Sequence, residues 1–312
     1  MKHHIFHDTV FSYDYPVRES IMEVRLQPRD DERQRCHHFH LTVSPRTMIY
    51  SFTDALGNHI HHFNITVPVT SLVVRAESTV EVLACPVLPA QLPPTSWQVL
   101  DNLHNDPLFD MVLPSQYAHP SPLLTAFMQR HHMVRGTDPL STVLTVSALL
   151  FETITYTPQS TSVDSPIDVV LTQQKGVCQD ITHVMIAICR TLGIPSRYVS
   201  GYLYHRRDDR DRSQSDATHA WLEVWLPELG WVGIDPTNRI VAGERHIRMA
   251  LGRDYADVPP TRGVYRGHAN EHLHVVVSVN DANLHTQAPP PVRPSWPTST
   301  VTQQQQMQQQ QQ

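Results

Sequence analysis

The sequence predicts an α+β protein in which an N-terminal antiparallel β-sandwich precedes a second domain, built from a long apolar helix packed on an antiparallel sheet. Two changes of pattern along the 312 residues carry this prediction. Residues 1–85 alternate apolar and polar side chains in short segments separated by proline and glycine, which is typical of antiparallel strands. From Pro122 onward, apolar residues recur at helical spacing instead. A chain of this length usually needs more than one core, so we expect two domains.

The first domain is assigned to residues 1–95, where the expected strands follow one another at intervals of about ten residues. Prolines such as Pro16, Pro28 and Pro68 close several of them. The expected strands cover residues 6–13, 20–26, 38–43, 47–53, 59–67, 71–76 and 78–85. No group of residues typical of catalysis lies here, so we expect a domain that packs on the second one or gates it.

Three further segments complete the expected organisation. Residues 96–121 are rich in proline, which prevents long helices and favours an extended connector. Residues 122–281 form the second domain. Residues 282–312 combine prolines with a glutamine-rich end, and they hold too little apolar surface to offset the entropy of ordering. We therefore expect a disordered tail.

Composition restricts the class of partner. Apolar residues make up 40% and charged residues 17% of the chain, so most of it should fold, and the net charge is −6. The basic residues are scattered, which argues against nucleic acid and against an anionic membrane surface as partners. No run of about 18 apolar residues occurs, so no membrane span is expected. The sequence does not define the oligomeric state.

Cysteines and histidines predict the cellular setting. The four cysteines form no CxxC pair, and the first residues lack the apolar segment of a signal peptide, which indicates a reducing, cytoplasmic protein without disulfides. Several of the 21 histidines come as adjacent pairs. Neighbours on a strand point to opposite faces, so such pairs do not suit one metal ion. We expect no metal and no cofactor.

The second domain begins with helices at Pro122 and Pro139 and a further helical start at residues 165–171. A long apolar helix follows over residues 178–192 and ends at Gly193. The remaining expected elements are strands at 197–204, 217–226 and 231–234, a short helical turn at 245–251 and a closing strand at 272–279.

Three residues in this domain suit nucleophilic catalysis. Cys178 follows a glycine turn and opens the apolar helix, so unsatisfied backbone N–H groups and the helix dipole favour its thiolate. His219 lies on one expected strand and Asp235 at the end of the next. His219 would take the thiol proton and later protonate the leaving group, while Asp235 would orient the imidazole. Separately, each signal is weak, because a lone cysteine at a helix start is usually a core residue.

Cys189 serves as an internal comparison. It lies in the middle of the same helix among Ile188 and Leu192, and we assign it to packing. Cys178 instead follows Lys175-Gly176-Val177, outside the apolar run. Cys178, His219 and Asp235, in this order on helix, strand and strand, form a combination that is more specific than any one of them.

These residues lie in motifs that resemble the bacterial transglutaminase-like family, whose members are often described as cysteine proteases. The motifs are Gly176-Val177-Cys178-Gln179-Asp180, the segment 192–202, His219-Ala220-Trp221-Leu222-Glu223-Val224, the segment 230–238, and Gly252-Arg253-Asp254-Tyr255-Ala256-Asp257-Val258-Pro259-Pro260 with Arg262-Gly263. The resemblance extends over residues 5–280, including the β domain. It implies a transglutaminase-like (papain-like) core with Cys178 as nucleophile, His219 as base and Asp235 as orienting acid.

One feature of that family is missing. Animal transglutaminases place a tryptophan upstream of the cysteine as an oxyanion donor, but no tryptophan lies between Trp97 and Cys178. Tyr156 is the candidate that could replace it, with its hydroxyl aimed at the acyl oxygen. The alternative for Tyr156 is a packed strand residue.

Three functions remain open. The first, which we favour because it needs only water as second substrate, is hydrolysis of a peptide or amide substrate by a cysteine protease or amidase. The second is transfer of a glutamine acyl group to an amine, as in a transglutaminase, and uses the same three residues. The third is a non-catalytic binding module on the same fold, against which the intact Cys178, His219 and Asp235 argue. Substrate class is limited to a peptide or protein.

Overall fold

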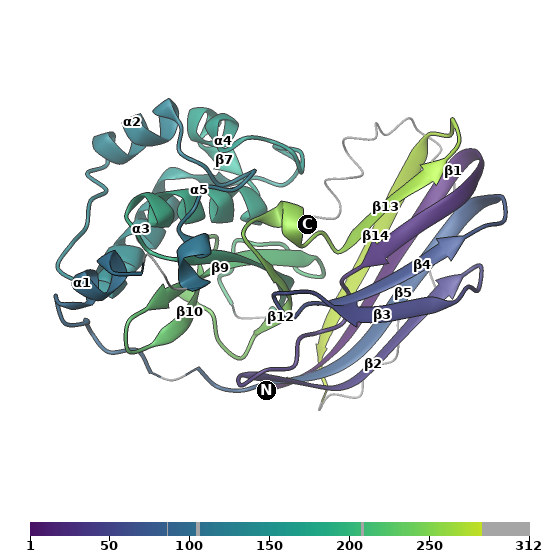
Figure 1. Cartoon of the computed structure of the whole chain (residues 1–312), viewed down its shortest axis with the longest axis horizontal. Coiled ribbons are helices and arrows are strands. Elements are labelled where there is room, and N and C mark those ends of the chain that lie inside the picture. Colours follow the sequence, from purple (N-terminus) through teal and green to yellow (C-terminus); the bar gives the residue numbers. More distant parts are fainter. Residues whose placement is uncertain (86, 104–106, 207–208, 283–312) are drawn as a thin grey trace.

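A computed structural model describes residues 1–85, 87–103, 107–206 and 209–282. It shows a helix-rich part beside a set of long strands (Figure 1). The expected fold class, α+β with antiparallel sheets and a β-rich N-terminal region, is confirmed. The expected disordered tail, from residue 283 onward, lies outside the described residues. None of the helices that the structure describes is long and apolar enough to cross a membrane.

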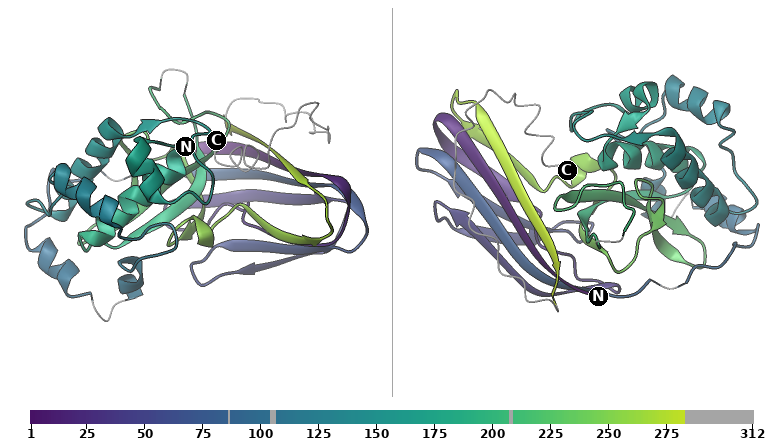
Figure 2. Two further views of the ribbon diagram at one scale, coloured as in Figure 1. Left: turned by 90° about the horizontal axis from the view of Figure 1, so that it is seen from above. Right: turned by 180° about the vertical axis from the view of Figure 1, so that it is seen from behind.

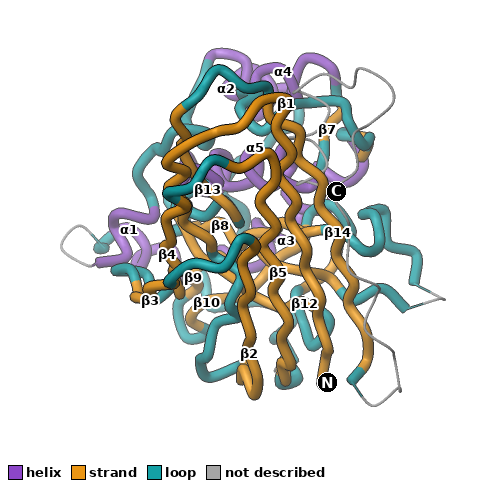
Figure 3. Tube along the Cα trace, turned by 90° about the vertical axis from the view of Figure 1, so that its right-hand side faces the viewer, coloured by secondary structure: helices purple, strands orange, loops and turns teal. Residues whose placement is uncertain are grey.

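The β domain is organised around one long strand, β1 (Lys2–Val24). The first half of β1 pairs with β5 and β14, and its second half pairs with β4 and β13. The two layers that share β1 enclose an apolar core that includes Phe11, Phe63, Leu72 and Leu273. Figure 3 shows the strands of the domain in front of the helical part. The other strands are β2 (Gln34–Ser44), β3 (Ile49–Thr53), β4 (His59–Ile65), β5 (Val69–Val82), β13 (Thr261–Arg266) and β14 (Glu271–Asp281).

The expectation that Pro16 ends the first strand is wrong. β1 continues through Pro16 because its pairing register shifts between Ser12 and Val17 and again between Arg18 and Ile21. Bulges of this kind take residues out of the ladder, so the missing N–H of a proline costs no hydrogen bond there. Residues 71–76 and 78–85 likewise belong to one strand, β5.

The expected closing strand at 272–279 does not belong to the second domain. β14 pairs with the first half of β1, with His274 opposite Val10 and Val277 opposite His7. β13 pairs with the second half of β1. The chain therefore returns to the β domain after Gly252, and residues 261–281 complete that domain. The alternating pattern indicates a strand but does not identify the partner strand.

The second part is a five-stranded antiparallel sheet with helices on one face (Figures 1 and 2). The strand order is β11-β10-β9-β8-β12, and α5 packs on β9 and β8. The expected short helical turn at 245–251 is wrong, because these residues form the edge strand β12, paired with β8. The helices are α2 (Pro122–Arg130), α3 (Pro139–Thr153), α4 (Ile167–Gln173) and α5 (Cys178–Thr191). The strands are β6 (Thr155–Tyr156), β7 (Lys175–Gly176), β8 (Ser196–Leu203), β9 (Thr218–Leu226), β10 (Gly230–Asp235), β11 (Ile240–Val241) and β12 (His246–Gly252).

The proline-rich segment is more than an extended connector. It contains a short helix, α1 (Ser96–Asp101), and a 3-10 turn, η1 (Pro107–Met111). Leu100, Leu103 and Ala118 are buried in the same apolar core as α5. Prolines keep its helices short, but its apolar side chains still have a surface to cover.

Two amides of the β domain hold the edge strand β12. The Gln34 side chain accepts the N–H of Arg248 at 2.8 Å and donates to the Arg248 carbonyl at 2.8 Å. The Asn58 side chain accepts the N–H of Leu251 at 2.7 Å and donates to its carbonyl at 2.8 Å. Each amide thereby replaces a neighbouring strand along an edge that would otherwise be unpaired. This contact fixes the β domain against the five-stranded sheet.

Candidate active site

Cys178 lies at the first position of α5, as expected, and only 3% of its surface is exposed. The preceding turn is held by Asp180, whose carboxylate accepts the N–H of Val177 at 2.8 Å and the hydroxyl of Thr161 at 2.5 Å. A Cβ at Gly176 would lie 2.9 Å from the Cβ of Asp180, so this close turn requires glycine. The turn therefore places the Cys178 sulfur at the start of the helix, where the helix dipole favours negative charge.

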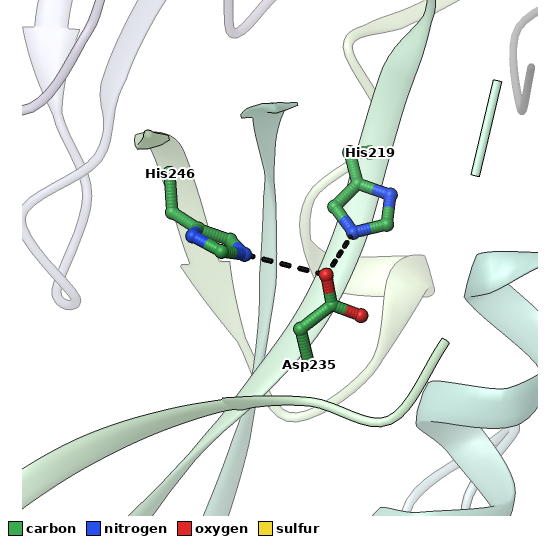
Figure 4. Close-up of side chains that lie close together, drawn as sticks. All are labelled: His219, Asp235 and His246. Atoms are coloured by element: carbon green, nitrogen blue, oxygen red, sulfur yellow. Dashed lines mark hydrogen bonds and ion pairs between the residues drawn. The ribbon is translucent and has the colours of Figure 1, made fainter. Parts of the chain in front are cut away.

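His219 and Asp235 come together as the sequence predicted. β9 and β10 are neighbours, and the Nε2 of His219 lies 2.7 Å from the Oδ2 of Asp235 (Figure 4). Both side chains are buried. The Cys178 thiol is hydrogen-bonded to His219, so the imidazole joins the thiol and the carboxylate.

The charge state of His219 follows from these contacts. Burial disfavours the charged imidazole, but the nearby Asp235 carboxylate, its hydrogen bond and the Cys178 thiol outweigh burial and raise the pKa of His219 to about 10. Burial likewise disfavours the carboxylate of Asp235. The charge of His219 and the hydrogen bonds from His219 and His246 nevertheless hold the pKa of Asp235 well below its usual range. The pair is therefore a buried ion pair at neutral pH.

Asp235 has further donors that fix its orientation. Its Oδ1 accepts the backbone N–H of Thr237 at 3.0 Å and that of Asn238 at 3.2 Å. Its Oδ2 accepts the Nδ2 of Asn238 at 2.8 Å. Both oxygens are thus saturated with hydrogen bonds, which a buried carboxylate requires.

Sequence reasoning missed His246, which lies on the other side of Asp235 (Figure 4). Its Nδ1 accepts the N–H of Gly243 at 3.2 Å, so its Nε2 carries the proton toward the Oδ2 of Asp235, 3.3 Å away. Burial lowers the pKa of His246, and it remains neutral. Position 246 lay in a segment expected to be a helical turn, and only the pairing of β12 with β8 brings it here.

His219, Asp235 and His246 also form a possible metal-ligand group, because one ligand atom from each lies within 4.8 Å of the others. The same atoms are engaged in the hydrogen bonds just described. We derive no step of the chemistry through a metal.

A small pocket opens beside Cys178. It contains about 10 Å³, roughly the space of one water molecule. Cys178, His219 and Tyr198 line it, together with Tyr255 and Pro260 of the segment that leads back to the β domain. That segment therefore forms one wall of the site, which the sequence did not reveal.

Tyr156 lies where the sequence placed it, next to the nucleophile. β6 pairs in parallel with β7, so Tyr156 is opposite Gly176. Burial and the proximity of Cys178 raise its pKa, and its hydroxyl is hydrogen-bonded to the backbone of Gln214. The role of Tyr156 as oxyanion donor stays a prediction.

Comparisons with known proteins agree with this arrangement. A model described as the transglutaminase-like superfamily matches residues 129–236, and a model of the bacterial transglutaminase-like N-terminal region matches residues 3–81. An uncharacterized protein of Mycobacterium leprae is 32% identical over 277 residues, covering 88% of this chain and 97% of its own. The chain belongs to the transglutaminase-like superfamily.

Two further proteins have a similar sequence or structure. A protein-glutamine gamma-glutamyltransferase of Pseudomonas aeruginosa is 30% identical over 188 residues, covering 56% of this chain and 26% of its own. The crystal structure of a "putative cysteine protease" from Cytophaga hutchinsonii has a TM-score of 0.69 and 23% identity, and the match covers 93% of both chains. This neighbour shows that both domains have the same fold in the two proteins. Cys178, His219 and Asp235 all lie within the matched superfamily core, whereas His246 lies beyond its end.

Proposed function

We propose that the protein carries out thiol-dependent acyl chemistry on peptide or amide substrates, and that Cys178, His219 and Asp235 form its catalytic triad. The observation that carries this proposal is the buried His219 imidazole, which is bonded to the Asp235 carboxylate on one side and to the Cys178 thiol on the other. Membership of a superfamily of thiol-dependent hydrolases and acyltransferases supports it.

In the first half of the reaction, His219 holds the proton of the Cys178 thiol, and the sulfur bonds to the substrate carbonyl carbon. The carbonyl electron pair moves to oxygen, where the backbone N–H groups at the start of α5 stabilise the charge. The tetrahedral intermediate then breaks its C–N bond, and His219 gives the proton to the departing amine. A thioester remains on Cys178. The raised pKa of His219 suits an imidazole that must hold a proton between these steps.

In the second half, water attacks the thioester carbonyl, and His219 removes a proton from the attacking water. The C–S bond breaks, the sulfur recovers its proton, and a carboxylic acid leaves. We propose this hydrolysis as the reaction, because it needs only water and no site for a second substrate.

Acyl transfer is the second candidate. An amine would replace water as the attacking group, and a new amide would form. The 30% identity to a protein-glutamine gamma-glutamyltransferase favours this alternative, although that match covers only a quarter of the relative, 26%.

One experiment separates the candidates. The wild-type protein and the Cys178→Ala variant are incubated with a diverse peptide library and a labelled primary amine, and products are identified by mass spectrometry. Cleavage or deamidation that depends on Cys178 supports hydrolysis, while incorporation of the amine supports transfer. Equal products from wild type and variant would overturn the proposed chemistry and leave a binding module.

A further inference from the structure

Tyr198 is a buried residue of the site to which no role has been given so far. It lies on β8, with 2% of its surface exposed, between α5 and the segment that returns to the β domain. Its ring packs at 5.1 Å from that of His183 and edge-on at 6.3 Å from that of Tyr255. These contacts hold the ring in one orientation, as a residue acting on substrate requires.

Tyr198 forms part of the wall of the pocket beside the nucleophile. It lines this pocket together with Cys178 and His219, and the pocket is small enough that the three side chains lie close to one another. Burial, and after it the proximity of Cys178, raise the pKa of Tyr198, so the hydroxyl keeps its proton. The hydroxyl is not one of the fully buried polar atoms without a partner among the described residues, which fits a hydroxyl that borders the pocket. A phenol in this place can donate a hydrogen bond to a substrate oxygen bound beside Cys178.

Two other tyrosines near the site differ from Tyr198 in one respect each. Tyr156 is also near Cys178, but its hydroxyl is already bonded to the backbone of Gln214. Tyr255 lines the same pocket, but its pKa is raised by burial and by Tyr117, and Cys178 does not contribute. Among these three, only Tyr198 both lines the pocket and has its pKa raised by Cys178.

We propose that the Tyr198 hydroxyl is a catalytic residue that donates a hydrogen bond to the substrate acyl oxygen when Cys178 attacks. The inference rests on the proposed function and names a further donor for it. As the S–C bond forms, the carbonyl electron pair moves to oxygen, and the O–H of Tyr198 points at that charge without giving up its proton. The proton of the thiol is still held by His219, and the phenol is unchanged after each turnover. A donor placed in advance in a dry site stabilises the transition state more than the substrate.

The test uses p-nitrophenyl acetate, a small activated ester that acylates a thiol and releases p-nitrophenolate. Release is followed for wild type, Tyr198→Phe, Tyr156→Phe and Tyr255→Phe. Release by Cys178→Ala is subtracted, because Cys36 and Cys85 are partly exposed. We expect Tyr198→Phe to lower kcat for Cys178 acylation by roughly 10²-fold with KM nearly unchanged, as for the loss of one oxyanion donor. Tyr156→Phe and Tyr255→Phe should lower kcat less than Tyr198→Phe does.

A second measurement separates chemistry from folding. Alkylation of Cys178 by iodoacetamide forms no oxyanion, so Tyr198→Phe should be alkylated at the wild-type rate. The inference is overturned if Tyr198→Phe keeps its kcat, if only KM rises, or if alkylation slows in parallel with acylation. If Cys178→Ala releases p-nitrophenolate as fast as wild type, the proposed function fails instead. A larger loss in Tyr156→Phe than in Tyr198→Phe would return the donor role to Tyr156.

Discussion

Helix α5 carries two buried cysteines, Cys178 and Cys189, whose surroundings differ. Cys178, 3% exposed, lies at the start of the helix against a pocket and a charged imidazole. Cys189, 0% exposed, lies further along the helix in the apolar core. Burial raises the pKa of the Cys189 thiol to about 12, and a hydrogen bond with Ser196 and the charge of Arg190 only partly oppose it. The two thiols therefore differ in their polar partners and in their positions on the helix, although both are buried.

The largest expected effect separates the two cysteines by mutation. Cys178→Ala should lower turnover by roughly 10⁴-fold or more, because the covalent intermediate can no longer form. Cys189→Ala should retain turnover within about twofold and lower the free energy of unfolding by about 1 kcal/mol, the effect of a small cavity. Turnover is measured with the substrate found in the peptide library, and unfolding by urea titration. Comparable turnover losses in the two variants would contradict the assignment.

The next effect concerns the carboxylate behind His219. Asp235→Asn should lower kcat by roughly 10²- to 10⁴-fold, because the amide neither stabilises the imidazolium nor selects the tautomer. The pKa of His219, about 10 in the wild type, is raised by Asp235. In the variant, burial lowers the pKa of His219 and no carboxylate charge opposes this effect. His219 therefore loses its proton at lower pH. The basic limb of the pH–rate profile should therefore move to lower pH. If the basic limb of the profile does not move, a group other than His219 determines the pH at which the rate falls.

Alkylation compares the two thiols in one unmodified protein. Iodoacetamide should modify Cys178 at least about tenfold faster than Cys189 in the folded state, since the thiolate is the reactive form. Mass spectrometry of the digested protein gives both rates, and unfolding in urea should make them similar. Equal, slow modification of the two residues in the folded protein would point to the binding-module alternative.

The contrast between the two cysteines was predictable from the sequence, because local signals carry it. A glycine turn before Cys178 and an apolar run around Cys189 are visible without the fold. The spacing of helix, strand and strand also predicted the His219–Asp235 pair, since neighbouring antiparallel strands bring their residues together. Local pattern therefore predicted that His219 and Asp235 lie side by side and that Cys178 opens the helix.

The parts that the sequence did not predict depend on contacts between distant segments. His246 reaches Asp235 only because β12 pairs with β8, and β14 leaves the catalytic core because it pairs with β1. An alternating pattern gives the same signal for any partner strand. In the sequence, Tyr198 could not be told from other strand residues. Pro260, which lines the same pocket, lies about sixty positions later in the chain.

A smaller effect is expected at His246, which orients Asp235 from the side away from His219. His246→Leu removes the donor and should lower kcat by about tenfold, the range for loss of an outer hydrogen-bond partner. His246→Gln, whose Nε2 can also donate to the carboxylate, should recover most of that loss. The readout is kcat together with the pH at which the basic limb falls. If the two variants are equally impaired, His246 acts by packing against Trp221, 5.1 Å away, and not through its hydrogen bond.

Substitutions in the β domain should have the smallest effect on the difference in reactivity between Cys178 and Cys189. Asn58→Ala leaves the N–H and C=O of Leu251 without their present partners, so the free energy of unfolding should fall by about 1–3 kcal/mol. Because Asn58 contacts β12 and not the pocket, the ratio of alkylation rates at Cys178 and Cys189 should not change. Gln34→Ala removes the same two hydrogen bonds from the N–H and C=O of Arg248, and it should lower stability without changing that ratio. If either variant raises the alkylation of Cys178 while the protein stays folded, the β domain controls access to the nucleophile.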